Sequence, residues 1–528
     1  MAVGLALFAL ACVWLGRGAF YVGPSDWDDM LYCDYAATGG AHFELRNRYV
    51  HVWGLRLFDL LFGTRLSAAT AYSTTLVIGL GWLAFFTARR VAGELCGFLA
   101  MALMLLFPPV LRYISTPHVD LTLAFWVLAA ILGLVTALER QVTRRYSLPA
   151  AIRGMATFFA LESKETALPL IGILPYLIVL RSKQRKLHLA SWAAGLAVGF
   201  GVLLVLDALF TQPGQPWSSN PLRYFGARPA SEPRLGMQRP ERSDKFMKRD
   251  FGSELMDTPF WAFTFFGAAG LARRFRTSLV LEALGLWMFA AIALTAVVAF
   301  RSWDIQIYDR YLIGPGATLV IGSAVWLVEL ARRPRGQELE NALWLVPLIA
   351  AALLVAVPYL VASYDGELPQ RGARALFFVL PVLLFLLFFT PWLSAARHLP
   401  LACAGIALAI SLYASVMTGL AHARQEHDEM APWYALVAKA DRANASIAVW
   451  DADQYPERRL LWRVRTLSAR ARDSVKVRTI DAPQKLAEHE WLLTRGCRRG
   501  DLTKLGFVQV VAGACSDRGH EWSVYRSR

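Results

Sequence analysis

The sequence predicts a polytopic α-helical membrane protein with about 13 transmembrane helices and a small C-terminal α/β extracytoplasmic domain. Hydrophobic residues make up 56% of the 528 residues and charged residues only 18%, whereas soluble domains average about 45–50% and about 25%. The apolar residues form blocks of about 20, the length that crosses about 30 Å of hydrocarbon. Short β-rich runs follow the last block. These observations together favour a membrane body with a water-soluble tail.

The apolar blocks define the expected spans in chain order. The first runs from Met1 to Phe20, and we interpret it as a retained helix because it lacks the basic n-region of a signal peptide. The next spans end at Arg90 and at Tyr113, and another runs from Asp120 to Arg140. The remaining blocks are a hairpin over 149–180, spans ending near Phe210, Arg276 and Arg301, a span over 311–330, and three last spans, Leu343–Val361, Ala375–Leu393 and Leu399–Leu420.

Alternate connections between the blocks are basic, and the positive-inside rule makes their side cytoplasmic. The N-terminus is therefore expected in the cytoplasm of a bacterial cell, with the chain in the inner (plasma) membrane. Outer loops 21–66 and 210–258 are expected on the periplasmic or extracellular side. The net charge of +15 follows from these connections, and no nucleic-acid-binding motif accompanies it. The basic connections are 89–90, 140–145, 181–186, 273–276, 332–335 and Arg397.

The hairpin over 149–180 is too short to cross the bilayer twice. Its two halves are each about 24 Å long as helices, against a hydrocarbon core of about 30 Å. The charged tip, Glu162 to Glu165, must therefore lie below the outer membrane surface. Charged turns persist at that depth only against protein or a water-filled cavity. The sequence thus predicts a polar cavity that opens to the outside.

The chain changes character after Leu420, which predicts two domains. Residues 1–420 form the transmembrane part, and residues 421–528 form a soluble periplasmic domain of about 100 residues, enough for one small α/β fold. The expected strands are Ser446–Trp450, Val475–Ile480, Glu490–Thr494, Phe507–Val511 and Glu521–Tyr525.

The first outer loop is the richest in groups that can carry chemistry. It holds the carboxylates Asp26, Asp28 and Asp29, followed by Tyr32. Carboxylates just beyond a membrane helix serve as a general base, as metal ligands or merely as a solvated loop, and the residues alone leave these alternatives open. Arg48 and His51 follow later in the same loop, and with Tyr32 they are candidates for binding the substrate or its phosphate.

Further candidates lie on the same outer side. Asp120 opens the fourth span, where an Asp also acts as a plain helix cap. Lys164 in the hairpin tip and Arg310 with Tyr311 are the cationic candidates. A lipid-phosphate substrate needs such cations to hold its charge and to stabilise it as a leaving group.

These motifs resemble the GT-C class of integral-membrane glycosyltransferases, which includes protein O-mannosyltransferases, lipid A aminoarabinose transferases and rhizobial lipopolysaccharide galacturonosyltransferases. The shared features are an acidic pair, a Tyr and an Ala-containing helix in the first outer loop, the last matched by Tyr35-Ala36. They also include an Asp opening the fourth span, a Lys in the next hairpin and an Arg-Tyr-Leu. They correspond to Asp28-Asp29-Met30-Leu31-Tyr32, Asp120, Ser163-Lys164-Glu165-Thr166 and Arg310-Tyr311-Leu312. Two departures are Asp29 in place of Glu and the absence of a Lys-Pro-Pro stretch near Arg48.

The resemblance implies transfer of a monosaccharide from a polyprenyl-phosphate donor to a lipid, glycan or protein acceptor at the outer face of the membrane. It implies Asp28 as the base, with Asp26 and Asp29 as neighbours able to replace it, and Lys164 and Arg310 as the phosphate cradle. Some members use a divalent metal and others do not, and this sequence shows no decisive metal set. Two other readings remain open, namely a transporter or flippase and a non-catalytic lipid-binding assembly subunit.

Overall fold

The computed structural model describes residues 27–38, 48–63, 66–139, 148–210, 261–275, 277–302, 313–332, 430–450, 475–495, 507–517 and 520–527, with a few single positions between them. The expected first span and the last three spans lie outside these residues. The total of about 13 helices and the division at residue 420 therefore stay predictions.

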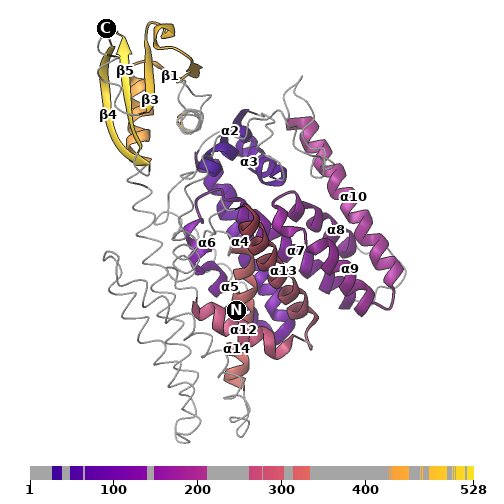
Figure 1. Ribbon diagram of the computed structural model, residues 1–528. Coiled ribbons are helices and arrows are strands. Elements are labelled where there is room, and N and C mark those ends of the chain that lie inside the picture. Colours follow the sequence, from indigo (N-terminus) through magenta and orange to yellow (C-terminus); the bar gives the residue numbers. More distant parts are fainter. Residues whose placement is uncertain are drawn as a thin grey trace, which may run out of the picture.

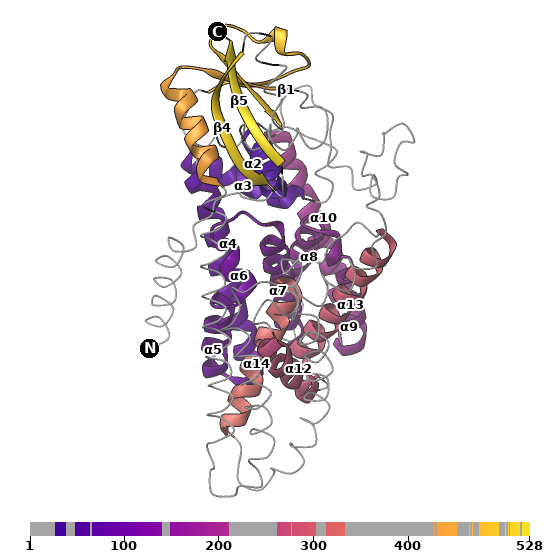
Figure 2. The same ribbon diagram turned by 60° about the vertical axis from the view of Figure 1, so that its left-hand side comes forward.

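The described part of residues 1–420 is a bundle of helices (Figures 1 and 2). Among the described residues, three helical segments are long and apolar enough to cross a membrane: Ser67–Ala92, Val119–Glu139 and Arg185–Leu209. The bundle's helices are α2 (Trp27–Thr38), α3 (Tyr49–Phe62), α4 (Leu66–Ala92), α5 (Glu94–Leu105), α6 (Pro108–Arg112), α7 (Val119–Glu139), α8 (Leu148–Leu161), α9 (Leu170–Arg181), α10 (Arg185–Phe210), α12 (Trp261–Arg274), α13 (Leu279–Ser302) and α14 (Ile313–Arg332).

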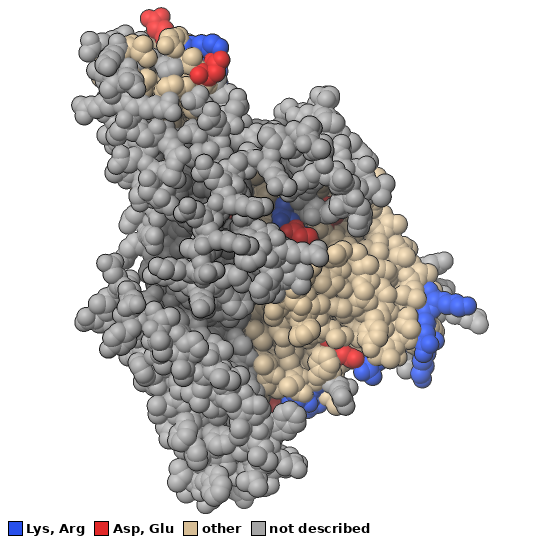
Figure 3. All heavy atoms as spheres, in the orientation of Figure 1, with Lys and Arg blue, Asp and Glu red and all other residues tan. Residues whose placement is uncertain are grey.

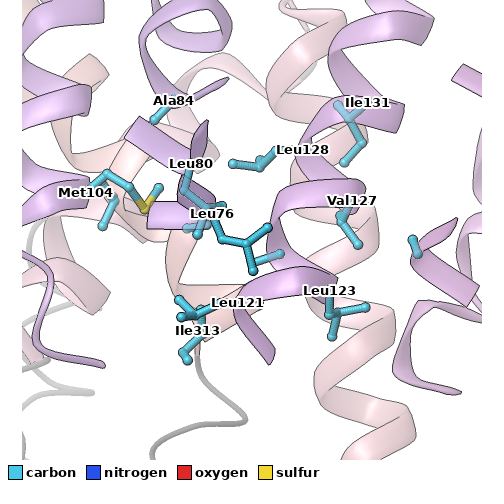
Figure 4. Close-up of a cluster of buried hydrophobic side chains, with 14 of the residues drawn as sticks. Leu76, Leu80, Ala84, Met104, Leu121, Leu123, Val127, Leu128, Ile131 and Ile313 are labelled. Atoms are coloured by element: carbon cyan, nitrogen blue, oxygen red, sulfur yellow. The ribbon is translucent and has the colours of Figure 1, made fainter. Parts of the chain in front are cut away.

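The centre of the bundle is an apolar core in which α7 contacts α4, α8 and α14. Figure 4 shows the side chains that meet there: Leu76 and Leu80 of α4 face Leu128 of α7, with Met104 of α5 and Ile313 of α14 close by. All five are at most 7% exposed. This core holds the described ends of α4, α7 and α14 in place relative to one another.

Most of the expected spans coincide with observed helices, and two expectations need correction. The span expected to run unbroken to Tyr113 divides into α5 and α6, because Pro108 and Pro109 cannot continue the hydrogen-bond ladder of α5. The 21–66 segment, expected as a polar loop, contains α2 and α3. Both carry buried apolar side chains, which explains why they fold against the bundle instead of remaining in solvent.

The hairpin over 149–180 has the predicted form of helix, tip and helix. α8 has 14 residues and α9 has 12, so at about 1.5 Å per residue neither helix spans about 30 Å. The tip residues Glu162, Ser163 and Lys164 are buried in the protein. The water-filled cavity inferred from this hairpin stays a prediction.

Ion pairs tie neighbouring helices together at the end of the bundle where α7 finishes. α7 has 21 residues, which places this end about 30 Å from the end where α7 starts. In Figure 3 the charged side chains of the described helices lie at the upper and lower margins of a broad uncharged face. This distribution is typical of a membrane protein. The pairs are Arg90–Glu139, Arg181–Glu282 and Arg274–Glu329.

Small residues let α12 and α14 pack with their backbones in close approach. A Cβ atom added to Gly270 would collide with the carbonyl oxygen of Gly322, and one added to Gly267 would collide with that of Leu319. Beside this crossing, Phe266 stacks on Trp326 with ring centroids 4.7 Å apart. The crossing therefore depends on the absence of side chains at these glycines.

The C-terminal strands form one five-stranded sheet in the order β2-β1-β3-β5-β4. β1 pairs in parallel with β2 and β3, whereas β5 pairs antiparallel with β3 and β4. Arg478 of β2 donates to Glu490 of β3, and this hydrogen bond lowers the pKa of the Glu490 carboxyl. Each of the five expected strands is found, with bounds β1 (Ser446–Trp450), β2 (Val477–Ile480), β3 (Glu490–Arg495), β4 (Phe507–Asp517) and β5 (His520–Ser527).

Helix 430–442 covers one face of this sheet, and we call the helix and the sheet together the C-terminal unit. Trp433 and Leu436 of the helix pack in one cluster with Ile447 of β1 and Leu493 of β3. Met30 of α2 belongs to the same cluster and is 1% exposed. The C-terminal unit therefore rests on α2, as Figure 2 shows at the end of the bundle where α2 and α3 lie.

We predict that Gly270→Ala lowers the melting temperature in detergent. The added methyl group forces α12 and α14 apart, and overpacking of this kind costs about 1–3 kcal/mol. Gly172→Ala in α9 is the matched control, because a Cβ atom there meets nothing within 4 Å. The expected result, measured by fluorescence-detected thermal unfolding, is a lower Tm for Gly270→Ala only. Equal melting temperatures for the two variants would contradict the close crossing.

Candidate functional site

The candidate site lies at the end of the bundle where α7 starts. Four segments distant in sequence meet there: α2, the start of α3, the start of α7, and the connection between α8 and α9. A backbone hydrogen bond from Val50 to Glu162 (3.4 Å) joins α3 to that connection. Figures 1 and 2 place α2 and α3 at this end, next to the C-terminal sheet.

A buried ion pair between Lys164 and Asp120 is the centre of the site. The Nζ atom of Lys164 donates to Oδ1 of Asp120 at 2.6 Å, and the side chains are 5% and 3% exposed. Asp120 lies in the first turn of α7, where the helix dipole stabilises a negative charge. The two residues, 44 positions apart, were both predicted from sequence, and the structure brings them into direct contact.

Lys164 is fixed by the way the chain leaves α8. The backbone N–H groups of Ser163 and Lys164 both donate to the carbonyl of Ala160 (3.1 Å each). The Ser163 hydroxyl donates to the backbone carbonyl of Phe159 (2.7 Å). The Lys164 carbonyl then accepts from Ala167 at 3.0 Å. These bonds close a tight turn that directs the lysine towards α7.

The second oxygen of Asp120 has unused hydrogen-bonding capacity. Its Oδ2 atom is buried and accepts no hydrogen bond from the described residues. His118 Nδ1 lies 3.4 Å from it, but this nitrogen accepts the backbone N–H of Asp120 at 3.3 Å. A buried carboxylate oxygen in this state is a ready acceptor for a ligand hydroxyl.

Arg48 forms a second ion pair beside the first. Its guanidinium donates to Oε2 of Glu165 at 2.7 Å and to the Ser163 carbonyl at 3.4 Å, and it also interacts with the hydroxyl of Tyr32. The Arg48 side chain is 15% exposed, whereas that of Glu165 is 50% exposed. Because the carboxylate is accessible to solvent, a stronger anion is able to replace it on the guanidinium.

His51 links α3 to the start of α7 and is completely buried. Its Nε2 lies 3.1 Å from the Pro117 carbonyl and its Nδ1 lies 2.8 Å from the Thr122 hydroxyl. A carbonyl only accepts, so Nε2 carries the proton and Nδ1 accepts from Thr122. Both ring nitrogens are thus occupied within the protein. The geometry gives His51 a positioning role, and its predicted role in substrate binding stays a prediction.

The acidic residues of the first outer loop lie on α2. Asp29 is 0% exposed, next to Met30, which packs against the C-terminal unit. The backbone of Asp28 belongs to the same helix, but its side chain lies outside the described residues. Asp26, Arg310 and Tyr311 also lie outside them. The chemical roles of all the site residues predicted from the sequence, namely Asp26, Asp28, Asp29, Tyr32, Arg48, His51, Asp120, Lys164, Arg310 and Tyr311, stay predictions.

Sequence reasoning missed three members of this network. Glu165 pairs with Arg48, and Thr122 and Tyr72 bond to His51 and to each other, with Tyr72 and Thr122 oxygens 3.0 Å apart. Glu165 stood beside Lys164 in the charged tip and was detectable there. Thr122 and Tyr72 lie inside apolar spans, where nothing in the sequence distinguishes them from core residues.

The described residues contain no group of three or more His, Cys, Asp or Glu side chains that could hold a metal ion. The nearest approach to one is His118 with Asp120, whose Oδ1 is already bound to Lys164. A divalent metal, which some GT-C members use and others do not, therefore remains neither supported nor excluded by the described residues.

Comparison with solved structures identifies the fold. The chain matches ArnT from Cupriavidus metallidurans in the apo state with a TM-score of 0.54, over 99% of this chain and 98% of that one. It matches the same protein bound to undecaprenyl phosphate with a TM-score of 0.56, over 99% and 97%. Identity is 16% in both matches. The chain has the GT-C fold. The resemblance inferred from the short motifs is thereby confirmed at the level of fold.

An oligosaccharyltransferase from Archaeoglobus fulgidus, which also has a GT-C fold, matches at 13% identity over 92% of this chain and 65% of that chain, with a TM-score of 0.43. No protein-family model matches the sequence, and no curated protein matches it either.

We predict that breaking the Lys164–Asp120 pair destabilises this GT-C fold. Asp120→Asn and Lys164→Met each leave one buried charge without its partner, which costs about 3–5 kcal/mol. The double variant removes both charges and is expected to lose less than the sum of the single losses. Denaturation of the purified protein in detergent measures all four stabilities. Strictly additive losses would mean that the two side chains are not coupled.

Proposed function

We propose that this chain is a membrane glycosyltransferase, which transfers a monosaccharide from a polyprenyl-phosphate donor to a lipid, glycan or protein acceptor at the outer face of the inner membrane. The observation that carries the proposal is the assembly of Lys164, Asp120 and Arg48 at one end of a GT-C fold. One solved structure of similar fold, ArnT, binds undecaprenyl phosphate.

Two cations are proposed to hold the donor phosphate. Asp120 keeps Lys164 charged and oriented, because its Oδ1 accepts from Nζ at 2.6 Å. Arg48 is paired with the half-exposed Glu165, and the phosphate would replace that carboxylate as its partner. Arginine suits this role because its planar donor groups match phosphate oxygens. Both cations would then stabilise the phosphate as it leaves the sugar.

A carboxylate of α2 is proposed as the general base. The acceptor hydroxyl must lose a proton as it attacks the anomeric carbon, and a carboxylate within hydrogen-bond reach can take it. Motif position favours Asp28, with Asp29 and Asp26 as neighbours. The unused Oδ2 atom of Asp120 supports a further role for this residue, accepting a hydrogen bond from a hydroxyl of the sugar.

We predict that Lys164→Met reduces sugar transfer by about 10²-fold or more, as the loss of a charge-stabilising donor does in other enzymes. Asp28→Asn removes the proposed base and is expected to abolish transfer. Purified protein in lipid nanodiscs would receive radiolabelled polyprenyl-phosphate sugars and a membrane extract as acceptor. Incorporated label measures the rate.

Lys183→Met provides the control for this assay, because Lys183 is exposed between α9 and α10, at the opposite end of the bundle. Lys164→Arg restores the charge and separates lost phosphate binding from misfolding. Transfer that persists in Asp28→Asn would remove Asp28 as the base. Absence of transfer from every carrier, together with measured movement of lipid or sugar across vesicles, would replace the proposal with a transporter.

The proposed orientation places the N-terminus in the cytoplasm and the C-terminal unit outside. We expect Lys183→Cys to react with a membrane-impermeant maleimide only in inside-out vesicles, and Glu488→Cys only in intact spheroplasts. Both positions are exposed in the structure. The parent chain, with its own cysteines, sets the background of labelling. Reaction of both cysteines from the same side would exclude this orientation.

A further inference from the structure

Inside the bundle, away from the candidate site, lies a buried arginine that has no acidic partner among the described residues. Arg153 of α8 is 0% exposed and is one of the largest completely buried side chains. Its Nη2 donates to the backbone carbonyl of His188 in α10. Its Nε and Nη1 have no hydrogen-bond partner within the part of the chain that the structure describes. The Nδ1 atom of the buried His188 also lacks one.

The carboxylates at this end of the bundle are engaged by other arginines. The described acidic side chains near the ends of α5, α7, α13 and α14 each form an ion pair, and none of those pairs includes Arg153. An isolated buried charge is costly, so a cation kept at this position requires an anion from elsewhere. The engaged pairs are Arg89–Glu94, Arg90–Glu139, Arg181–Glu282 and Arg273–Glu329.

The segments that lead into α8 and α10 are also positively charged. Residues 140–153 and 181–188 contain eight Lys or Arg and no Asp or Glu. α8 and α10 run parallel, because Arg153 contacts His188 while Gly154 approaches Trp192 and Phe158 approaches Gly199 further along. Both helices therefore start at this end, and both direct the positive end of their dipole towards it.

The depth of Arg153 matches the level of lipid headgroups. Arg153 is the sixth residue of α8, and its guanidinium reaches His188, the fourth residue of α10. The segment Arg185–Leu209 of α10 is long and apolar enough to cross a membrane, so its first turn lies near one membrane surface. Basic sites between helices at that level are suited to the phosphate of an acidic lipid.

We propose that Arg153 and His188 form a binding site for the phosphate group of an anionic phospholipid, between the starts of α8 and α10. The phosphate accepts from Nε and Nη1 of Arg153 and from His188, and the two helix starts add to the attraction. Because Arg153 is fully covered, binding requires a small separation of the first turns of the two helices. The site lies at the end of the bundle opposite to Lys164, and it does not depend on the proposed transferase activity.

The test compares the thermal stability of the protein in detergent with and without added lipid. A ligand that binds only the folded state raises the melting temperature in proportion to its affinity. Phosphatidylglycerol is expected to raise the Tm of the wild-type protein, whereas phosphatidylcholine, which has no net charge, is not. In Arg153→Met the rise with phosphatidylglycerol is lost. Native mass spectrometry of the same samples counts the bound lipid directly.

Arg185→Met is the matched control, because Arg185 is an exposed cation in the first turn of α10; it is expected to keep the lipid-dependent rise. If Arg153→Met unfolds during purification, Arg153→Lys and His188→Phe serve instead, with weakened lipid response expected in both. Inorganic phosphate forms a separate arm, and an Arg153-dependent rise with it would assign the same site to a soluble phosphate. An equal lipid response in wild type and Arg153→Met would overturn the proposal.

Discussion

The buried ion pair between Lys164 and Asp120 is the constraint on which the arrangement of this molecule depends. It joins the connection after α8 to the first turn of α7. Burying either charge without the other would be strongly destabilising. The short hairpin of α8 and α9 follows from the same requirement, since a longer α8 would carry Lys164 beyond Asp120. Arg48 and Glu165 extend the pair to the start of α3. Two adjacent ion pairs thereby link the ends of three helices, α3, α7 and α8.

The ion pairs of the described helices lie at the two ends of α7, about 30 Å apart. At one end the ion pairs converge on a small buried cluster with unused hydrogen-bonding capacity, which is typical of a binding site. At the other end they link α4 to α7, α9 to α13, and α12 to α14. Those pairs join helix ends, and none of them includes Arg153. The two ends therefore differ in how their charges are arranged, although both are rich in charge.

Much of this organisation could be predicted from the sequence, because the signals are local. Span positions follow from apolar length, and the five strands follow from short β-rich runs that are separated by charged stretches. The sequence placed Asp120 and Lys164 on the same side of the membrane but did not predict their contact, because no local signal encodes the distance between two side chains. Thr122 and Tyr72 escaped prediction for a related reason. Each is a polar residue in an apolar helix, and only its spatial neighbour, His51, gives it a function in the network.

The burial of α2 is the clearest case of a feature that sequence reasoning could not reach. A run of aspartates beyond a membrane helix suggests a solvated loop, yet Leu31, Tyr32 and Tyr35 pack into the bundle while Met30 packs against Trp433 of the C-terminal unit. α2 is thus buried from two sides, by residues close in the chain and by residues some 400 positions away. Asp29, the residue before Met30, is completely buried. The C-terminal unit consequently does more than end the chain, because it fixes the helix that carries the acidic residues of the proposed site.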